Sequence, residues 1–239
     1  MKIALIGYGK MGQAIEKVAV AKGHEIVLKI DVNNAHELNA AHLQKADVAI
    51  EFTGPHSAFS NVMQCINSGT PVICGSTGWL AKWHAIEAAC IQQKGSLIYA
   101  SNFSIGVNLF FELNKFLAHL MKQHPEYEVT ITEIHHTQKK DAPSGTAISL
   151  AEQIMQEIPS KKKWVNTITN LADELSIISE RIDPAPGTHK ILYHSTIDDI
   201  EIVHTAHSRM GFADGAVLAA EFLIGKQGIF TMKDVLGLH

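Results

Sequence analysis

The chain has 239 residues, with 20 Lys and Arg residues against 24 Asp and Glu residues, so its formal net charge is -4. This balance removes the general electrostatic attraction to nucleic acid or to an anionic membrane surface, so any anion site must be a local concentration of positive groups. With 46% hydrophobic and 18% charged residues, the composition is that of a globular protein that can bury one large core or two smaller ones.

The chain starts with a strand-like segment, MKIALIGYG, without the basic start, apolar stretch and small-residue cleavage site of a signal peptide. No apolar run approaches the roughly 18 residues of a membrane-spanning helix. We therefore expect a cytoplasmic protein. Cys65, Cys74 and Cys90 show no C-x-x-C spacing and lie in apolar stretches, which favours buried, reduced thiols over a metal or redox site.

Short apolar runs alternate with stretches of helical spacing over the first hundred residues. The expected strands are Ile3–Ile6, Ile26–Ile30, Val48–Phe52, Val72–Cys74 and Leu97–Tyr99, and the expected helices are Gln13–Lys22, Ser57–Asn67 and Leu80–Gln93. Gly23 and Gly69 follow two of these helices, where a left-handed cap residue is expected. The alternation predicts an α/β fold in which crossover helices join the strands of a parallel sheet.

The regular alternation of strands and helices ends at about residue 104, and the pattern after it is typical of an α+β fold. The expected elements are a helix over Val107–Lys122, a strand over Glu128–Ile134, a helix over Thr146–Glu157, strands over Leu175–Ser179, Lys190–Ile197 and Ile200–His207, a helix over Ala213–Ile224 and a last short segment, Val235–Leu238. The last two strands predict a hairpin that turns at Asp198 and Asp199, in a mostly antiparallel or mixed sheet. The Lys161–Lys163 run is interpreted as a solvated loop.

A glycine-rich turn lies between the first expected strand and the first expected helix. Gly7, Tyr8, Gly9, Lys10, Met11 and Gly12 match G-x-G-x-x-G, in which glycines allow a tight turn and the approach of a pyrophosphate to the helix N-terminus. Asp31 ends the second strand, 19 residues past Gly12, where a carboxylate accepts hydrogen bonds from the adenosine ribose. The context favours a dinucleotide site over a glycine-rich turn without a ligand.

Small or polar residues also follow the next three strands. They are Phe52 and Thr53 after the third strand, Gly75, Ser76 and Thr77 after the fourth, and Ala100, Ser101, Asn102 and Phe103 after the fifth. In an open parallel sheet the ligand lies outside the carboxyl ends of the strands, so these corners are expected to line the same cofactor groove. We expect the nicotinamide ring near Thr77 and Asn102.

The polar loop after Glu128–Ile134 concentrates basic groups in a chain whose net charge is negative. His135, His136, Lys139 and Lys140 fall within six residues, and Ser144, Gly145 and Thr146 then open a helix whose free N–H groups favour an anion. This arrangement suits a small dicarboxylate. On chemistry alone, an exposed loop followed by an ordinary helix cap remains an alternative, whereas adjacent histidines without cysteine have poor geometry for a metal.

The segment E-x-H-H-x-x-K-x-D-A-P-S-G-T-A at 133–147 resembles the signature of the dihydrodipicolinate reductase family. Other segments resemble that family in the same order along the chain: the N-terminal glycine motif, G-S-T-G at 75–78, S-N-F-S-I-G-V-N at 101–108, G-T-H at 187–189 and H-x-A-x-S-R-M-x-F-A-x-G-A at 204–216. The resemblance covers about residues 3 to 236.

The resemblance implies a Rossmann dinucleotide-binding domain at 1–104 plus 214–239, with an inserted α+β substrate-binding and oligomerisation domain at 105–213. It implies a homotetramer that reduces a cyclic imine dicarboxylate with NADH or NADPH in lysine and diaminopimelate biosynthesis. It also implies that His135 and Lys139 move protons, while His136, Gly145 and Thr146 bind the substrate. Which of His135 and Lys139 delivers the proton stays open.

Two other classes of function are weighed against this resemblance. Another nicotinamide enzyme, such as an aldehyde dehydrogenase, would need a catalytic thiol or a different base in the second half, and no cysteine follows Cys90. A dinucleotide sensor without activity would show substitutions in the basic loop, which is intact.

The cofactor preference is predicted from the residues around Asp31. Its carboxylate repels the 2′-phosphate of NADPH, and the next residues, Val32, Asn33 and Asn34, supply no cation to receive that phosphate. Lys29 lies two residues earlier on the strand, on the same face, and is the nearest candidate. We expect NADH to be used at least as well as NADPH.

Overall fold

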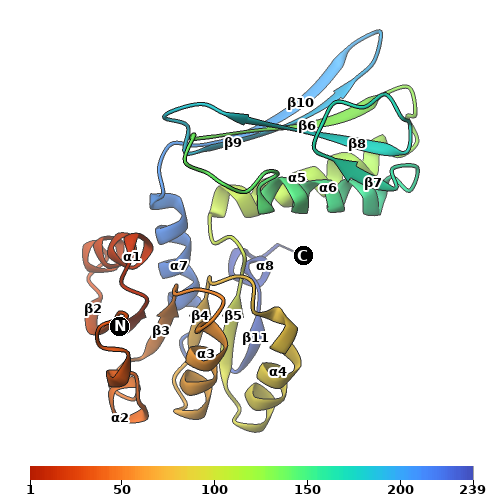
Figure 1. The fold of residues 1–239 in the computed structure, drawn as a ribbon. Coiled ribbons are helices and arrows are strands. Elements are labelled where there is room, and N and C mark those ends of the chain that lie inside the picture. The colour runs from red at the N-terminus through yellow and green to blue at the C-terminus, as the bar shows by residue number, and fades with distance from the viewer. Residues whose placement is uncertain (239) are drawn as a thin grey trace. The chain divides into compact units, whose positions relative to one another are not determined.

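A computed structural model describes residues 1–238 (Figure 1), and the chain divides into two compact units. Unit 1 comprises Met1–Ile105 and Arg209–His239, and unit 2 comprises Gly106–Ser208. The boundary expected between residues 213 and 214 falls inside helix α7 (Met210–Leu223), which belongs to unit 1 from its first residue. The two units are described separately below.

Unit 1 is built on a six-stranded sheet in the order β11-β5-β4-β3-β1-β2. The strands are β1 (Lys2–Ile6), β2 (Glu25–Ile30), β3 (Val48–Glu51), β4 (Val72–Cys74), β5 (Ser96–Tyr99) and β11 (Gly228–Phe230). Every neighbouring pair is parallel. This confirms the parallel sheet predicted from the first hundred residues, and β11 adds a strand that the sequence pattern did not predict.

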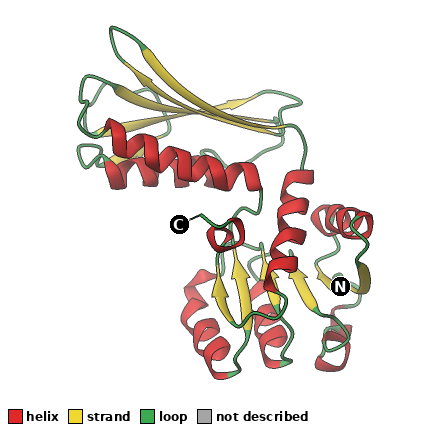
Figure 2. Ribbon diagram, turned by 180° about the vertical axis from the view of Figure 1, so that it is seen from behind, coloured by secondary structure: helices red, strands yellow, loops and turns green. Residues whose placement is uncertain are grey.

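Helices cover both faces of this sheet (Figures 1 and 2). They are α1 (Lys10–Ala21), α2 (Ala40–Leu43), α3 (Ala58–Asn67), α4 (Trp83–Gln92), α7 and α8 (Met232–Leu236), with single 3₁₀ turns at Ala35–Glu37 and Leu80–Lys82. One core joins α1 and α7 to Ile3, Leu5, Val48 and Ile50. The other joins α3 and α4 to Ala4, Ile6 and Ala49, the alternate residues of the same strands. Both faces are apolar because a strand covered on two sides must bury successive residues.

The three cysteines lie in the second of these cores. Cys65, Cys74 and Cys90 are buried and unpaired, as the sequence predicted, and burial raises the pKa of each thiol. Cys65 and Cys90 therefore act as small apolar residues, while the Cys74 thiol also donates a 3.1 Å hydrogen bond to the Glu51 carboxylate.

Unit 2 holds a five-stranded mixed sheet in the order β10-β9-β6-β8-β7. The strands are β6 (Glu128–His135), β7 (Lys163–Val165), β8 (Glu174–Arg181), β9 (Gly187–His194) and β10 (Asp199–Ala206). Strand β9 runs antiparallel to β6 and β10, whereas β8 runs parallel to β6 and β7. The helices α5 (Ile105–Met121) and α6 (Gly145–Glu157) pack on one face of this sheet (Figure 1).

The alternation along β6 determines which side chains reach the helices. Val129, Ile131, Glu133 and His135 are buried, while the residues between them are only half-buried. The first two join the apolar core with α5 and α6. Because side chains alternate along a strand, Glu133 and His135 continue the same face beyond that core.

Two local expectations for unit 2 were wrong. Lys161 is buried rather than solvated, and its Nζ donates to Glu128 and, at 2.9 Å, to the carbonyl of Glu174, because β7 extends the sheet beside β8. The hairpin turns at residues 195–198, since Asp199 already pairs with His194 in the ladder.

Candidate active site

The glycine-rich turn of unit 1 is packed too tightly for larger residues at two positions. Gly7 has φ +98°, and a Cβ there would lie 2.6 Å from the carbonyl carbon of Phe52 and 2.9 Å from the nitrogen of Thr53. A Cβ on Gly12 would overlap the carbonyl of Gly7. Gly9 has open space around it, and as the N-cap of α1 it leaves the first N–H groups of that helix without a side-chain cap. These groups fit a pyrophosphate oxygen.

A cavity of about 580 Å³ adjoins this turn in unit 1. Its lining includes five of the predicted cofactor residues, Gly7, Gly9, Asp31, Phe52 and Thr53. The strands that contribute them are β1, β2 and β3, whose carboxyl ends meet at one edge of the sheet. The volume and the glycine turn fit a dinucleotide, and they correspond to the place where nucleotides bind in doubly wound sheets.

The same cavity is lined by polar residues that the sequence interpretation missed. These polar residues lie on or beside the first turns of α3 and are His56, Ser57, Ser60, Asn61 and Gln64, whereas Ile30, Ala35 and Leu38 add apolar lining. The spacing of Ser57, Ser60, Asn61 and Gln64 places them on one helical face, which is the signal that could have identified them.

The remaining predicted cofactor residues do not line this cavity. Tyr8, Lys10, Met11 and Gly12 belong to the turn and the first turn of α1, and the others follow β4 and β5 as predicted: Gly75, Ser76, Thr77, Ala100, Ser101, Asn102 and Phe103. The Phe52 and Phe103 rings pack 5.7 Å apart, and a Cβ on Gly75 would overlap the Phe52 ring. The segments that follow β3, β4 and β5 are therefore in contact. Phe103 is buried in the core, which makes its contribution one of packing. The Ser76 hydroxyl is buried and makes no hydrogen bond to another described residue.

The Lys29 ammonium is engaged within unit 1. Its Nζ lies 2.6 Å from Glu16 Oε1 and 4.9 Å from the centre of the Tyr8 ring, and the Tyr8 hydroxyl donates to Glu16. The pKa of Lys29 is raised and that of Glu16 is lowered, chiefly by their mutual hydrogen bond. Within residues 1–238, no cation pairs with the Asp31 carboxylate, whose Oδ1 accepts a 2.7 Å hydrogen bond from the nitrogen of Val32.

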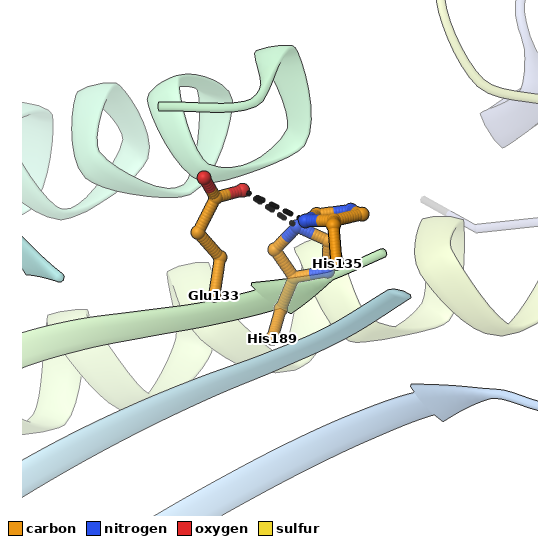
Figure 3. A group of neighbouring side chains, drawn as sticks. All are labelled: Glu133, His135 and His189. Carbon is orange, nitrogen blue, oxygen red and sulfur yellow. Dashed lines mark ion pairs between the residues drawn. The ribbon is translucent and has the colours of Figure 1, made fainter. Parts of the chain in front are cut away.

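In unit 2, a buried carboxylate and two imidazoles meet where β6 and β9 run side by side (Figure 3). Glu133 is fully buried and is the ladder partner of His189. Glu133 Oε2 lies 3.2 Å from Nδ1 of His135 and 3.9 Å from Nε2 of His189. Nδ1 of His135 is therefore in close polar contact with Glu133, although the two groups do not form a well-aligned hydrogen bond.

The Glu133 carboxylate also holds the start of α6 and a guanidinium. Both of its oxygens lie 3.1 Å from the nitrogen of Ser144, and Oε1 lies 3.2 Å from Arg181 Nη2. Arg181 Nη2 also donates to the carbonyl of Asp141 at 2.6 Å. Burial by itself raises the pKa of Glu133, but the close contact with His135 and the hydrogen bond from Ser144 hold that pKa well below its usual range.

The basic loop connects this cluster to the helix. Lys139 Nζ lies 2.9 and 2.8 Å from the two carboxylate oxygens of Asp141, whose pKa this contact lowers. Lys140 is exposed, and His136 is half-buried. Ser144 caps α6 by accepting a 3.2 Å hydrogen bond from the nitrogen of Ala147, as both an anion-binding helix start and an ordinary helix cap predict.

Gly145 and Thr146 form the first turn of α6. Gly145 is exposed with open space around its Cα, and Thr146 is half-buried. The first turn carries no acidic residue, so nothing in it opposes an anion at the free N–H groups. The arrangement can therefore hold a carboxylate near an imidazole and an ammonium.

Glu133, Arg181 and His189 were not among the predicted site residues. The E-x-H spacing of Glu133 and His135 gave a signal, since residues two apart on a strand share a face. Arg181 could not be found locally, because it reaches the site through the parallel pairing of His135 with Arg181 on β8.

Ligand-type atoms of Glu133, His135 and His189 lie within 4.8 Å of one another, which raises the question of a metal. The carboxylate oxygens already accept from Ser144 and Arg181. A guanidinium 3.2 Å away repels a second cation, so the cluster fits proton chemistry better than metal binding.

His189 makes stability dependent on pH. Burial, helped by the nearby His135, lowers the pKa of His189 from 6.5 to about 4. As the pH falls, the unfolded chain takes up the proton before the folded protein does, so stability is full above about pH 6.5 and is lost between there and about pH 4. Between neutral pH and about pH 5 the loss from this residue is about 2 kcal/mol.

We expect His189→Gln to lack the part of the pH-dependent loss of stability that comes from His189. Urea unfolding at fixed protein concentration, near neutral pH and at about pH 5, measures the loss for each protein, and the loss in the variant should be smaller by about 2 kcal/mol. Equal losses in the two proteins would show that His189 titrates normally.

None of the helices in residues 1–238 is both long enough and apolar enough to span a membrane.

Comparisons with known proteins agree on one family. Residues 1–103 match "Dihydrodipicolinate reductase, N-terminus", and residues 106–236 match "Dihydrodipicolinate reductase, C-terminus". A curated 4-hydroxy-tetrahydrodipicolinate reductase of Christiangramia forsetii is 50% identical over 238 residues, which are 99% of this chain and 98% of that protein. The reductase of Methanoculleus marisnigri is 34% identical and is covered completely, as is this chain.

Solved structures give the same result. A dipicolinate-bound dihydrodipicolinate reductase from Paenisporosarcina sp. TG-14 superimposes with a TM-score of 0.77 at 25% identity, over 97% of each chain. An amine dehydrogenase from Mycobacterium smegmatis, with a TM-score of 0.61 at 11% identity over 97% of this chain and 95% of that one, shares the fold alone.

Proposed function

Because the chain belongs to the dihydrodipicolinate reductase family, we propose that His135 and Lys139 carry the proton chemistry of its reaction. The chain is an NAD(P)H-dependent oxidoreductase that converts 4-hydroxy-tetrahydrodipicolinate to tetrahydrodipicolinate and water in lysine and diaminopimelate biosynthesis, by reducing the cyclic imine dicarboxylate that the loss of water leaves. The observation that supports the residue roles is the meeting of an imidazole, an ammonium and a free helix N-terminus around one loop of unit 2.

The proton donor is needed because reduction of a conjugated imine leaves an electron-rich enamine carbon. The bound nicotinamide supplies the hydride. His135 keeps one ring nitrogen beside Glu133, which leaves Nε2 for exchange with the substrate. Lys139 is an ammonium held by Asp141, so it is placed to stabilise negative charge or to donate a proton.

The substrate carboxylates are assigned to the start of α6. The N–H groups of Gly145 and Thr146 and the Thr146 hydroxyl bind one carboxylate, with His136 as a further polar contact. The relative from Paenisporosarcina is described as dipicolinate-bound, and dipicolinate carries two carboxylates on a planar ring. It is therefore a suitable probe for this site.

The function is tested by a coupled assay. The product of dihydrodipicolinate synthase, made in the cuvette, is offered with NADH or NADPH, and the loss of nicotinamide absorbance is followed. We expect turnover that dipicolinate inhibits competitively with the substrate. Absence of nicotinamide oxidation with active synthase present would contradict the function.

We further propose that the cofactor is bound by the turn at Gly7–Gly12 and by Asp31, with NADH used at least as well as NADPH. The support is the Asp31 carboxylate at the cavity and the engagement of Lys29 by Glu16, which leaves less positive charge for a 2′-phosphate. The values of kcat/KM for the two cofactors at fixed substrate decide this. An NADPH preference above about tenfold, or about 1.4 kcal/mol, contradicts the proposal.

Lys29→Gln serves as the control for this measurement. If Lys29 contacts the 2′-phosphate, the variant loses kcat/KM for NADPH and keeps that for NADH. If Lys29 only pairs with Glu16, the two values keep their ratio.

A cytoplasmic homotetramer is proposed as the working form. The support is the edge strand β10, whose Val203 side chain is half-exposed, and the packing of both unit 2 helices on one face of the sheet. An unpaired edge and an uncovered sheet face are features that assembly protects. Light scattering after gel filtration should give four times the 26.1 kDa of one chain; a monomer would contradict the assembly.

A further inference from the structure

Glu133 has no place in the proton transfers described above, yet its carboxylate is the most enclosed charged group beside His135. Its side chain has no exposed surface and lies on the face of β6 that packs against the helices. A buried carboxylate is costly unless it is paired and hydrogen-bonded, and Glu133 meets both conditions through Arg181 and Ser144.

The position of this carboxylate distinguishes the two nitrogens of the His135 ring. Nδ1 lies 3.2 Å from Glu133 Oε2, and it is buried without another partner. Nε2 lies beside Gly187, where a Cβ would come within 3.2 Å of it. A glycine at this position therefore leaves room at the nitrogen that is not next to the carboxylate.

The tautomer of a neutral imidazole follows from such surroundings. A carboxylate accepts but cannot donate, so it favours the tautomer with the proton on the nitrogen that faces it. His189 competes weakly for this role, because its Nε2 lies 3.9 Å from Glu133 and 3.1 Å from the Ser144 hydroxyl.

We propose that Glu133 is a positioning residue that keeps a proton on Nδ1 of His135, so that Nε2 exchanges the proton with the substrate. Through the nitrogen of Ser144, the same carboxylate fixes that ring relative to the first turn of α6, where the substrate carboxylate binds. This inference rests on the proton role proposed for His135. Its physical content, the tautomer of one ring, is measurable without turnover.

The first experiment uses the wild-type enzyme. Protein labelled with ¹⁵N only in histidine is examined by NMR above the pKa of the ring, and His135 is assigned by the signals missing from His135→Gln. We expect the Nδ1–H tautomer. An Nε2–H tautomer in the wild type overturns the proposal, whatever the variants do.

The second experiment uses Glu133→Gln, which keeps the shape of the side chain and removes its charge. The amide can donate to Nδ1, so the Nε2–H tautomer of His135 should increase. We expect kcat to fall by about 10²–10⁴, the range for a misplaced catalytic proton, while the KM for NADH changes less than about threefold.

Glu128→Gln is the matched control. Glu128 lies on the same strand and pairs with Lys161, away from the imidazoles, so this variant loses an ion pair of β6 without touching the ring. It should keep both the His135 tautomer and kcat. If Glu128→Gln and Glu133→Gln lose activity equally and the tautomer is unchanged in both, Glu133 acts only on stability and the proposal fails.

Two results separate this inference from the proposed function. A His135→Gln enzyme with normal kcat refutes the proton role of His135, whereas a tautomer that responds to Glu133→Gln still supports the carboxylate's control of the ring. A Glu133→Gln enzyme with normal kcat but a reversed tautomer overturns the link between the two.

Discussion

His135→Ala and Lys139→Ala should each lower kcat by about 10²–10⁴, the range expected when a general acid or base is removed. The affinity for NADH should stay within about twofold, because the proposed cofactor residues belong to unit 1 and these two residues belong to unit 2. Steady-state kinetics gives kcat, and quenching of protein fluorescence by NADH gives the affinity.

The loop contains its own control for this prediction. Lys140 follows Lys139 directly but is exposed, whereas the Lys139 ammonium is held by Asp141. Lys140→Ala should therefore keep kcat while removing the same charge from the same loop. If Lys140→Ala and Lys139→Ala lose activity to the same extent, the loop contributes only its general positive charge. A variant at 135 or 139 with near-normal kcat removes that residue from the proton path.

Gly7→Ala should abolish cofactor binding by disrupting the fold around the turn. The added Cβ would lie 2.6 Å from the carbonyl carbon of Phe52, and alanine would have to adopt φ +98°. The left-handed conformation costs about 1–2 kcal/mol and the overpacking about 1–3 kcal/mol. A total of about 2–5 kcal/mol is a large part of the 5–15 kcal/mol that stabilises a typical domain.

Gly9→Ala is the comparison, since Gly9 has open space and an ordinary φ of -79°. We expect it to unfold at the wild-type urea concentration and to lose NADH affinity, because the methyl group keeps the pyrophosphate from the backbone. Chemical denaturation and NADH titration of both variants separate the two effects. Equal stability of Gly7→Ala and Gly9→Ala would contradict the packing argument.

The parallel sheet of unit 1 was predictable because each of its first five strands is a separate apolar run. The strand β11 was missed because Gly228–Phe230 is three residues long and is defined by its pairing with β5. The strand β7 was missed for the same reason, since Lys163–Val165 is a strand only beside β8. Short segments of this kind take their conformation from a neighbour that is distant in sequence.

The candidate site also contains both residues that could be predicted from local sequence and residues that distant segments bring in. The turn at Gly7–Gly12 and the loop at His135–Thr146 could be predicted as site segments because each is one continuous segment with a recognisable order of residues. Arg181 is 46 residues beyond His135 and reaches it only through strand register. The polar face of α3 could be recognised from its helical spacing, whereas its position beside the glycine-rich turn follows from the cavity.

Because the chain returns to unit 1 only after residue 208, unit 1 cannot complete its folding until late in synthesis. Helix α7 supplies Ala213, Ala216, Val217, Ala220 and Leu223 to the core that also holds Ile3 and Leu5. Every proposed cofactor residue precedes residue 104, but the ribosome adds this helix only after the whole of unit 2. Until then α1 alone covers this apolar face of the nascent sheet, so the time for which the rest of the face is exposed to chaperones depends on the length of unit 2.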